Sequence, residues 1–215
     1  MSTPTLIRNV KGLMAAALCG LSVTSCADLA RTGRGPAYLI VESVSGARGG
    51  SGGAGTFTSS LLSDVITIVD VKVGSTTVPT PTIFNDLGQA RLRAEMKNAL
   101  SPTAPTPASS ITINRYRVRF RRTDGQNREG IDVPYGFDGG TTVTIPVGGS
   151  ALVNFDLVRH QAKSEPPLVT LVGGRGLIFL SAIAEVTFYG QDQAGNAVSV
   201  SGTIDVQFGD FGDSQ

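Results

Sequence analysis

The sequence has few of the residues on which many protein functions depend. Its 215 residues include no tryptophan, one histidine and two cysteines. One histidine excludes a multi-histidine metal centre, and two cysteines exclude both a disulfide-rich scaffold and a cysteine-rich zinc site. Only 16% of the residues are charged and the net charge is +1, which argues against a nucleic-acid-binding protein. The length predicts one domain or at most two small ones, since a domain usually has about 100–200 residues.

The N-terminal segment has the pattern of an export signal. Met1–Ser25 contains no acidic residue, and Arg8 and Lys11 are its only charges. The apolar run Leu13–Leu21 follows them, and this basic-then-apolar order is typical of a secretory signal peptide. The run is too short for a membrane-spanning helix, which needs about 20 apolar residues. A buried N-terminal helix is the alternative interpretation.

The signal segment ends in Val-Thr-Ser-Cys at positions 23–26. This resembles the lipobox of bacterial lipoproteins, which has an aliphatic residue, two small residues and an obligatory cysteine. The resemblance implies that residues 1–25 are cleaved and that Cys26 carries a thioether-linked diacylglycerol and an N-linked acyl chain. Three chains would anchor the protein firmly in a bilayer, because two membrane signals already give stable attachment. Signal cleavage nearby, with Cys26 left as a free thiol, is the alternative.

The residues after Cys26 complete the predicted organisation. Ala27 stands where Asp usually marks inner-membrane retention in Gram-negative lipoproteins, so the resemblance implies the outer membrane, facing the periplasm or the surface. Residues 26–36 are polar and predict a tether, and 37–215 predict one domain. Loss of Met1–Ser25 removes two of the 18 basic and none of the 17 acidic residues, which gives a net charge of −1. Cys19 is lost as well, so the mature domain has no disulfide.

Most of the remaining chain predicts strands. Alternation of apolar and polar residues, the pattern of half-buried strands, occurs at 38–44, 65–73, 111–113, 116–121, 142–147, 153–158, 184–189 and 198–208. The apolar phase slips between Ile113 and Tyr116, as a β-bulge requires. Residues 89–98 combine strict alternation with helix formers. We expect a strand there, with a helix as the alternative.

Turns and loops complete an all-β prediction. Ser75–Pro81 and Ser101–Ser109 are rich in Ser, Thr and Pro, and proline keeps a segment out of a sheet interior. A turn at Gly148-Gly149 joins two of the predicted strands. About eight short strands with long Gly/Pro-rich loops indicate an antiparallel, immunoglobulin-like β-sandwich.

Two segments resemble known sandwich families. Ile113–Phe120 is similar to the central strand of fibronectin type III-like domains, with an aliphatic residue before Tyr-x-Val-x-aromatic. Glu185–Val198 looks like the last hairpin of bacterial immunoglobulin-like domains, whose turn often reads Asp-x-Ala-Gly-Asn. In such a turn Asp accepts hydrogen bonds, while Gly and Asn tolerate positive φ. The chain lacks the core Trp and the cysteine pair of immunoglobulin domains. These resemblances imply a fold and no activity.

Two catalytic patterns lack the context that they need. The glycine-rich stretch Gly46–Gly55 matches both a dinucleotide-binding fingerprint and a nucleophile elbow around Ser51. Both require a strand that leads into a helix, and the residues after Gly55 favour a strand or loop, so we interpret the stretch as a flexible loop.

His160, the only histidine, would need an orienting carboxylate and a nucleophile to act as a catalytic base. Asp156 is the local carboxylate but falls on a strand's polar face, so a loop histidine bonded to backbone is expected.

Acidic residues gather in one predicted hairpin. Asp124, Glu129 and Asp132 lie within 123–132, and calcium binds carboxylates and carbonyls. The spacing of an EF-hand is absent. We therefore expect a solvated hairpin and no metal, with a calcium site here or near Asp192 as the alternative.

Arginines form the most notable charge cluster. Arg115, Arg117, Arg119 and Arg121 alternate along one predicted strand, so they would share a face at about 7 Å intervals. The strip would suit an anionic partner such as lipid headgroups or polysaccharide, or it would simply be a charged strand that resists aggregation. Carboxylates that could pair with it are Glu42, Glu95, Asp156 and Glu185.

These observations favour a lipid-anchored, exported sandwich with a structural or protein-binding role in the cell envelope, and no enzyme. Its partners would be the bilayer, through acylated Cys26, and another envelope protein, with no cofactor and no nucleic acid. A protein partner can add a strand to a sheet edge, whereas sugar platforms usually need exposed aromatic residues. A carbohydrate- or anionic-surface-binding module is the alternative, and an envelope hydrolase using Ser51 or paired acids is the least favoured reading.

Overall fold

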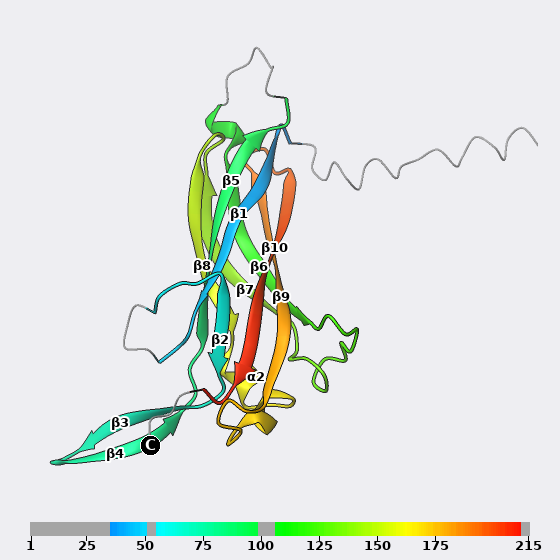
Figure 1. The fold of residues 1–215 in the computed structure, drawn as a ribbon. Coiled ribbons are helices and arrows are strands. Elements are labelled where there is room, and N and C mark those ends of the chain that lie inside the picture. The colour runs from blue at the N-terminus through cyan, green and yellow to red at the C-terminus, as the bar shows by residue number, and fades with distance from the viewer. Residues whose placement is uncertain (1–34, 51–54, 99–105, 212–215) are drawn as a thin grey trace, which may run out of the picture. The chain divides into compact units, whose positions relative to one another are not determined.

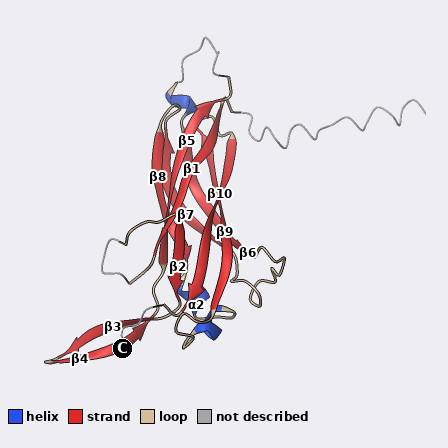
Figure 2. Cartoon of the chain, viewed as in Figure 1, coloured by secondary structure: helices blue, strands red, loops and turns tan. Residues whose placement is uncertain are grey.

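The computed structural model describes residues 35–50, 55–98 and 106–211, which belong to one compact unit, Gly33–Gln215. Strands dominate it (Figure 2). Figure 1 shows the elements, which are β1 (Ala37–Ala47), β2 (Ser60–Asp64), β3 (Thr67–Val73), β4 (Thr76–Thr82), β5 (Asp86–Met96), η1 (Pro107–Ser109), β6 (Ile111–Arg121), β7 (Phe137–Ile145), β8 (Ser150–Val158), α2 (His160–Lys163), η2 (Leu168–Leu171), β9 (Phe179–Asp192) and β10 (Ala197–Gly209).

Eight of these strands form a two-layered sandwich. The smaller sheet has the order β1-β5-β8, and the larger has the order β2-β10-β9-β6-β7. Neighbouring strands are antiparallel except β2 and β10, which are parallel. In the larger sheet the last two strands, β9 and β10, pair with each other, and β9 also pairs with β6, while β1, β5 and β8 form the facing sheet. The predicted all-β sandwich with about eight strands is therefore confirmed.

The core lies between the two sheets and follows from the period-2 pattern. On β6, the buried side chains of Tyr116, Val118 and Phe120 alternate with arginines. Aromatic rings meet across the layers, with 5.3 Å between the centroids of Tyr116 and Phe155 and 5.4 Å between those of Phe155 and Phe188. Burying each such ring stabilises the fold by about 1.5–3 kcal/mol. Apolar packing, without a disulfide in the described residues, holds the layers together.

Two predictions about individual strands are confirmed. Residues 89–98 contribute to β5, where Ala90, Leu92 and Ala94 are fully buried and the arginines between them are exposed. Burial of the alternate positions outweighed helix propensity. The predicted bulge is also present, since the register of β6 shifts between Ile113 and Arg115 against both of its neighbours.

Other predictions are confirmed only in part. A strand is present in the predicted segment 65–73, as β3, but it is an exposed arm of a two-stranded hairpin and not a half-buried strand of the sandwich. Ser75–Pro81, expected as a loop, contains most of its partner β4. Proline excludes a segment from a sheet interior but not from an edge. The turn at Gly148-Gly149 joins β7 and β8, which belong to different sheets, so it does not close a hairpin. Of Ser101–Ser109, the described part ends in η1.

The turn between β9 and β10 behaves as the resemblance implied. The carboxylate of Asp192 accepts hydrogen bonds from the backbone N–H groups of Ala194 and Asn196, at 3.0 and 2.9 Å, and from the Asn196 amide at 2.8 Å. Gly195 has φ +83°, which a glycine adopts at no steric cost. A Cβ on Gly35, next to the start of β1, would touch Asp192 and Asn196, so the chain enters the sandwich at this end, which we call the entry end.

Candidate functional site

The residue with the clearest predicted chemistry, Cys26, lies outside the described residues, as do the predicted signal peptide and most of the tether. Ser51, the nucleophile of the hydrolase reading, also lies outside them. The segment that follows its loop leads into strand β2 rather than a helix, so the strand-to-helix context of both glycine-rich motifs is missing. Among the described residues, no helix is long and apolar enough to cross a membrane.

The predicted arginine strip lies on the outer face of the larger sheet. Arg115, Arg117, Arg119 and Arg121 extend from β6, whose alternate side chains point into the core. The first two lie near one carboxylate, with Asp138 on β7 at 3.7 Å from Arg115 and 3.9 Å from Arg117. The Arg115 guanidinium also lies 4.2 Å from the centroid of the Tyr189 ring. Half of the strip is therefore engaged within the molecule.

The other half of the strip is more open. Arg119 lies opposite Glu185 of β9 in the register, and Arg121 opposite Ile183. Over the described residues neither guanidinium has a carboxylate within 4.0 Å. The buried Nε of Arg117 also donates to no acceptor there. The sequence located the strip correctly but missed Asp138, the carboxylate that pairs with it.

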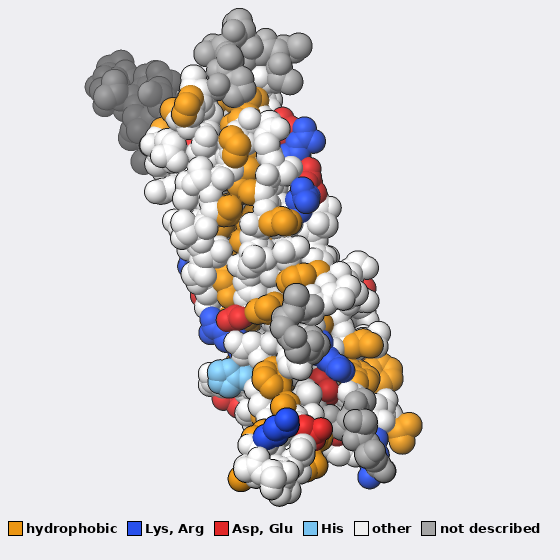
Figure 3. Space-filling view, turned by 90° about the vertical axis from the view of Figure 1, so that its left-hand side faces the viewer, with side chains coloured by type: hydrophobic (Ala, Val, Ile, Leu, Met, Phe, Trp, Pro, Cys, Tyr) orange, Lys and Arg blue, Asp and Glu red, His pale blue; other side chains and the backbone are white. Residues whose placement is uncertain are grey.

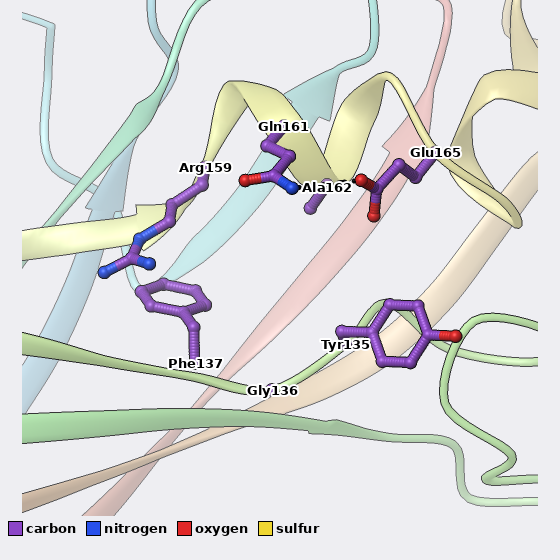
Figure 4. Close-up of a pocket in the computed structure, with 7 residues that line it drawn as sticks. All are labelled: Tyr135, Gly136, Phe137, Arg159, Gln161, Ala162 and Glu165. Carbon is purple, nitrogen blue, oxygen red and sulfur yellow. Dashed lines mark hydrogen bonds between the residues drawn. The ribbon is translucent and has the colours of Figure 1, made fainter.

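A pocket of about 220 Å³ opens beside the start of β7 (Figure 4). The Arg159 guanidinium lies 4.0 Å from the centroid of Phe137 and donates a 2.6 Å hydrogen bond to the Asp138 carbonyl. Gln161 donates to Glu165 at 3.0 Å. Glu165 supplies the only carboxyl group in the lining, whereas glycoside hydrolysis needs two carboxyl groups.

His160 is held by a side chain and not by the backbone contact that we expected. Its Nδ1 lies 2.9 Å from the Oδ1 of Asn85, and that oxygen also accepts the His160 backbone N–H at 2.7 Å. Asn85 carries no charge, so it cannot orient and stabilise a charged imidazolium as a triad carboxylate does. The observed contacts tie the start of α2 to the residue before β5.

Two of the three carboxylates of the acidic hairpin, Asp124 and Asp132, accept hydrogen bonds from within it. A hydrogen bond from the Gln126 backbone, together with Arg122, lowers the pKa of Asp124. The Arg128 guanidinium donates to Asp132 at 2.7 Å and lowers its pKa. No group of three or more His, Cys, Asp or Glu side chains that could hold a metal occurs in the described part of the chain.

A buried ion pair, which the sequence did not predict, lies at the opposite end of the sandwich from the entry end. Lys163 on α2 donates to Asp86 of β5 at 2.9 Å, and their side chains are 1% and 0% exposed. Asp86 also accepts the hydroxyl of Ser63 at 2.6 Å and the backbone N–H of Gly49 at 2.8 Å. Burial lowers the pKa of Lys163, and the charge of Asp86 opposes that shift.

A second buried carboxylate, Asp64, follows Ser63, the residue whose hydroxyl donates to Asp86. Asp64, at the end of β2, accepts the backbone N–H of Phe211 at 3.0 Å and lies 3.6 Å from Arg48. Asp210 accepts the backbone N–H of Gly173 at 2.7 Å. These bonds connect the last described residues to β2 and to the loop before β9. We call this end of the sandwich the distal end.

Large apolar side chains are exposed on the loops that leave the distal end. Leu177 is 87% exposed, and Ile178 and Phe179 follow it at 59% and 56%. The loop after β6 carries Ile131 and Tyr135, which are also exposed. Arg121 at the end of β6 pairs with Ile183 near the start of β9, so both loops leave the same end of the larger sheet. Figure 3 shows hydrophobic side chains at the surface of this lower end.

Comparison of the chain with protein-family models, with curated proteins and with solved structures finds no match.

Proposed function

We propose that this protein is a lipid-anchored, exported β-sandwich that binds another protein of the cell envelope and has no catalytic activity. The exposed apolar loop Leu177–Phe179 carries this proposal. Contiguous apolar side chains exposed at one place are typical of protein interaction sites. The sandwich below them has an apolar core, and a hydrogen bond from the Gly173 backbone to Asp210 holds the base of the loop.

The place where the tether joins the sandwich supports docking of a partner at the distal end. The tether reaches the sandwich at the entry end, beside the turn after β9, and the apolar loop lies at the other end of that strand. The 14 residues of β9 extend over about 45 Å at 3.3 Å per residue. An anchor at Cys26 would thus join the end that lies farther from the proposed docking loop.

Crosslinking in intact envelopes tests the docking loop. We expect wild-type protein to capture a distinct envelope protein, and Leu177→Asp to lose it, since a charge in an apolar contact is costly to bury. Leu152→Asp on β8, another exposed leucine, is the matched control and should retain the partner. Capture that survives Leu177→Asp combined with Ile178→Asp would refute the docking loop.

The anchor is tested separately by replacing Cys26 with Ala and labelling cells with radioactive palmitate. The proposal predicts that the label is lost and that the protein leaves the membrane fraction, because one missing cysteine removes every acyl chain. A matched Cys19→Ala variant, within the predicted signal peptide, should keep both. Persistent label or unchanged fractionation of the Cys26→Ala variant would contradict lipid anchoring.

An anionic surface is the second candidate partner, favoured by the open guanidinium groups of Arg119 and Arg121. We expect binding to vesicles with anionic lipid to fall with salt, as exposed charges are screened. Arg119→Glu combined with Arg121→Glu should abolish it, whereas Arg91→Glu on the other sheet should not. Unchanged vesicle binding by the double variant would exclude the strip.

A further inference from the structure

The hairpin formed by β3 and β4 makes an exposed two-stranded arm whose edges differ. Its strands pair from Thr67 with Thr82 to Val73 with Thr76, and Gly74 in the turn has φ +66°. A two-residue turn of this kind places glycine first and closes on a pair of residues that exchange hydrogen bonds. Because hydrogen-bonded and non-hydrogen-bonded pairs alternate along an antiparallel ladder, the closing pair determines which backbone groups point outward.

Proline blocks the outer edge of β4. The non-hydrogen-bonded pairs of the hairpin are Lys72 with Thr77, Asp70 with Pro79 and Ile68 with Pro81. The backbone groups of these six residues point away from the hairpin. Two of the three outward positions on β4 are therefore prolines, which have no N–H to donate. A further strand cannot pair well with that edge, and proline is one of the devices that protects edge strands.

The outer edge of β3 has no such protection near the hairpin's tip. Asp70 and Lys72 direct their backbone N–H and C=O groups outward, and both side chains are exposed. Over the described residues neither side chain has an ion-pair partner. They lie two positions apart, so they share one face of the strand. This edge offers four backbone groups flanked by one negative and one positive charge.

We propose that β3 pairs antiparallel with β3 of a second copy of this chain, about a two-fold axis at Val71. In this register Asp70 lies opposite Lys72 of the second copy, and Lys72 lies opposite its Asp70. Both pairs use the outward backbone groups, so the two copies exchange four hydrogen bonds and form two opposite-charge cross-strand pairs. The two-fold arrangement is closed and self-complementary, as in most homodimers.

Charge selects this register over its neighbours. An axis at residue 70 would set Asp70 against its own copy, and an axis at residue 72 would do the same to Lys72. Like charges directly opposite are destabilising. The axis at Val71 also joins the exposed valine faces, because Val71 meets its own copy and Val73 meets Val69 of the second copy. Val71 and Val73 are 42% and 64% exposed in the single chain, and β-branched cross-strand pairs stabilise sheets.

Cysteine crosslinking of the full chain tests the axis, with Cys19→Ala and Cys26→Ala as the background. Val71→Cys should form an intermolecular disulfide under mild oxidation, since the Cα atoms of a non-hydrogen-bonded pair lie about 4.5 Å apart, within disulfide range. Val73→Cys is the matched control. It is more exposed and lies on the same face, but it would face Val69 of the second copy and should crosslink far less.

Charge reversal in the Val71→Cys background tests the register. Asp70→Lys and Lys72→Asp should each reduce the crosslink by about tenfold or more, because two attractive pairs become repulsive. The double variant Asp70→Lys/Lys72→Asp should restore it. A mixture of the two single variants should crosslink to each other and not to themselves, which a folding defect in either variant would not produce.

Two results would overturn the proposal: equal crosslinking of Val71→Cys and Val73→Cys, or a yield that charge reversal leaves unchanged. The test is independent of the proposed docking function. Leu177→Asp should leave the Val71→Cys crosslink intact, and Asp70→Lys should leave the envelope partner bound at the distal loop, so failure of one proposal does not mimic failure of the other.

Discussion

Lys163 and Asp86 show how strongly one buried pair can depend on both of its members. Removing the lysine leaves a carboxylate that is 0% exposed and still holds Ser63 and Gly49. We expect Lys163→Met to lower the free energy of unfolding by about 3–5 kcal/mol, as for other buried charges that lose a partner. Urea unfolding measures the loss, and Arg91→Met, at an exposed arginine on the same strand as Asp86, provides the control.

The double variant Lys163→Met/Asp86→Leu should be less destabilised than the sum of its single variants, since it removes both charges together. A Lys163→Met protein within about 0.5 kcal/mol of wild type would show that the pair contributes nothing to stability.

Asp192 makes the stability of the last hairpin depend on pH. Burial alone would raise its pKa, but hydrogen bonds from Asn196 and Ala194 outweigh burial and lower it. The folded state therefore binds the proton less well than the unfolded state does. This contribution is complete above the ordinary pKa of Asp, and it is lost as pH falls through the lowered pKa.

We accordingly expect Asp192→Ala to cost about 1.5–3 kcal/mol at neutral pH, the usual range for hydrogen bonds to a charged group. The cost should shrink in acid, and urea unfolding from about pH 7 to about pH 2 measures it. Asp205→Ala, at an exposed carboxylate on β10, should change little. An Asp192→Ala cost that is the same at both ends of this range would contradict the mechanism.

At the residue scale, local chemistry was predictable and distant pairing was not. The role of Asp192 follows from a five-residue motif that defines its own turn. Lys163 and Asp86 are 77 positions apart, and neither lies in a pattern that distinguishes it from a solvated charge. The pairing of Arg115 and Arg117 with Asp138 was missed for the same reason, because register and not spacing brings β7 beside β6.

Among the elements, β9 places a glycine, Gly190, against the backbone of β6 beside the bulge. A Cβ on Gly190 of β9 would lie 2.3 Å from the carbonyl oxygen of Thr112 on β6. Backbone cannot move aside easily, so Gly190→Ala should destabilise the protein by about 1–3 kcal/mol, the usual cost of overpacking. Thermal or urea unfolding measures the change.

Gly140→Ala is the matched control, since a Cβ there meets nothing within 4 Å. We expect a change within about 0.5 kcal/mol. Equal stability of the two variants would mean that β6 shifts freely at the bulge, which the packed core beneath it argues against.

Strands with one buried face were predictable because burial imposes period 2. β5 was recognised despite its helix formers, and the bulge in β6 was visible as a phase slip. The failures are β2 and β4. β2 is only five residues long, too short to show a periodicity, and β4 carries prolines at outward positions of an exposed hairpin, where they are tolerated. The alternation of apolar and polar residues therefore predicts strands with one buried face better than it predicts strands that are short or exposed.

For the whole molecule, the sequence predicted the class of fold but not the assignment of strands to sheets. β1 pairs with β5, and β5 pairs with β8, across separations that no local pattern encodes. The distal end likewise combines loops that follow β6 and precede β9. A docking surface built from separate loops leaves no contiguous motif, although Leu177–Phe179 is visible in the sequence as an apolar run after glycines.

The packed sandwich and the exposed β3–β4 hairpin should differ in local stability within one chain. β9 lies between β10 and β6 and its alternate side chains are buried, so its amides should exchange hydrogen only through global unfolding. A two-stranded hairpin alone is marginally stable, so the amides of β3 and β4 should exchange much faster. Hydrogen exchange followed by NMR or mass spectrometry measures both.

Protein concentration separates the hairpin's own stability from its proposed pairing. If β3 pairs between copies, the outward amides of Asp70 and Lys72 gain acceptors only in the dimer, so their protection should rise with concentration. The amides of Thr67 and Val69 face β4 and should change only through the hairpin as a whole, and those of β9 should not change. If the protection of the amides of residues 70 and 72 does not depend on protein concentration, or is the same in wild type and Asp70→Lys, then β3 does not pair with β3 of a second copy.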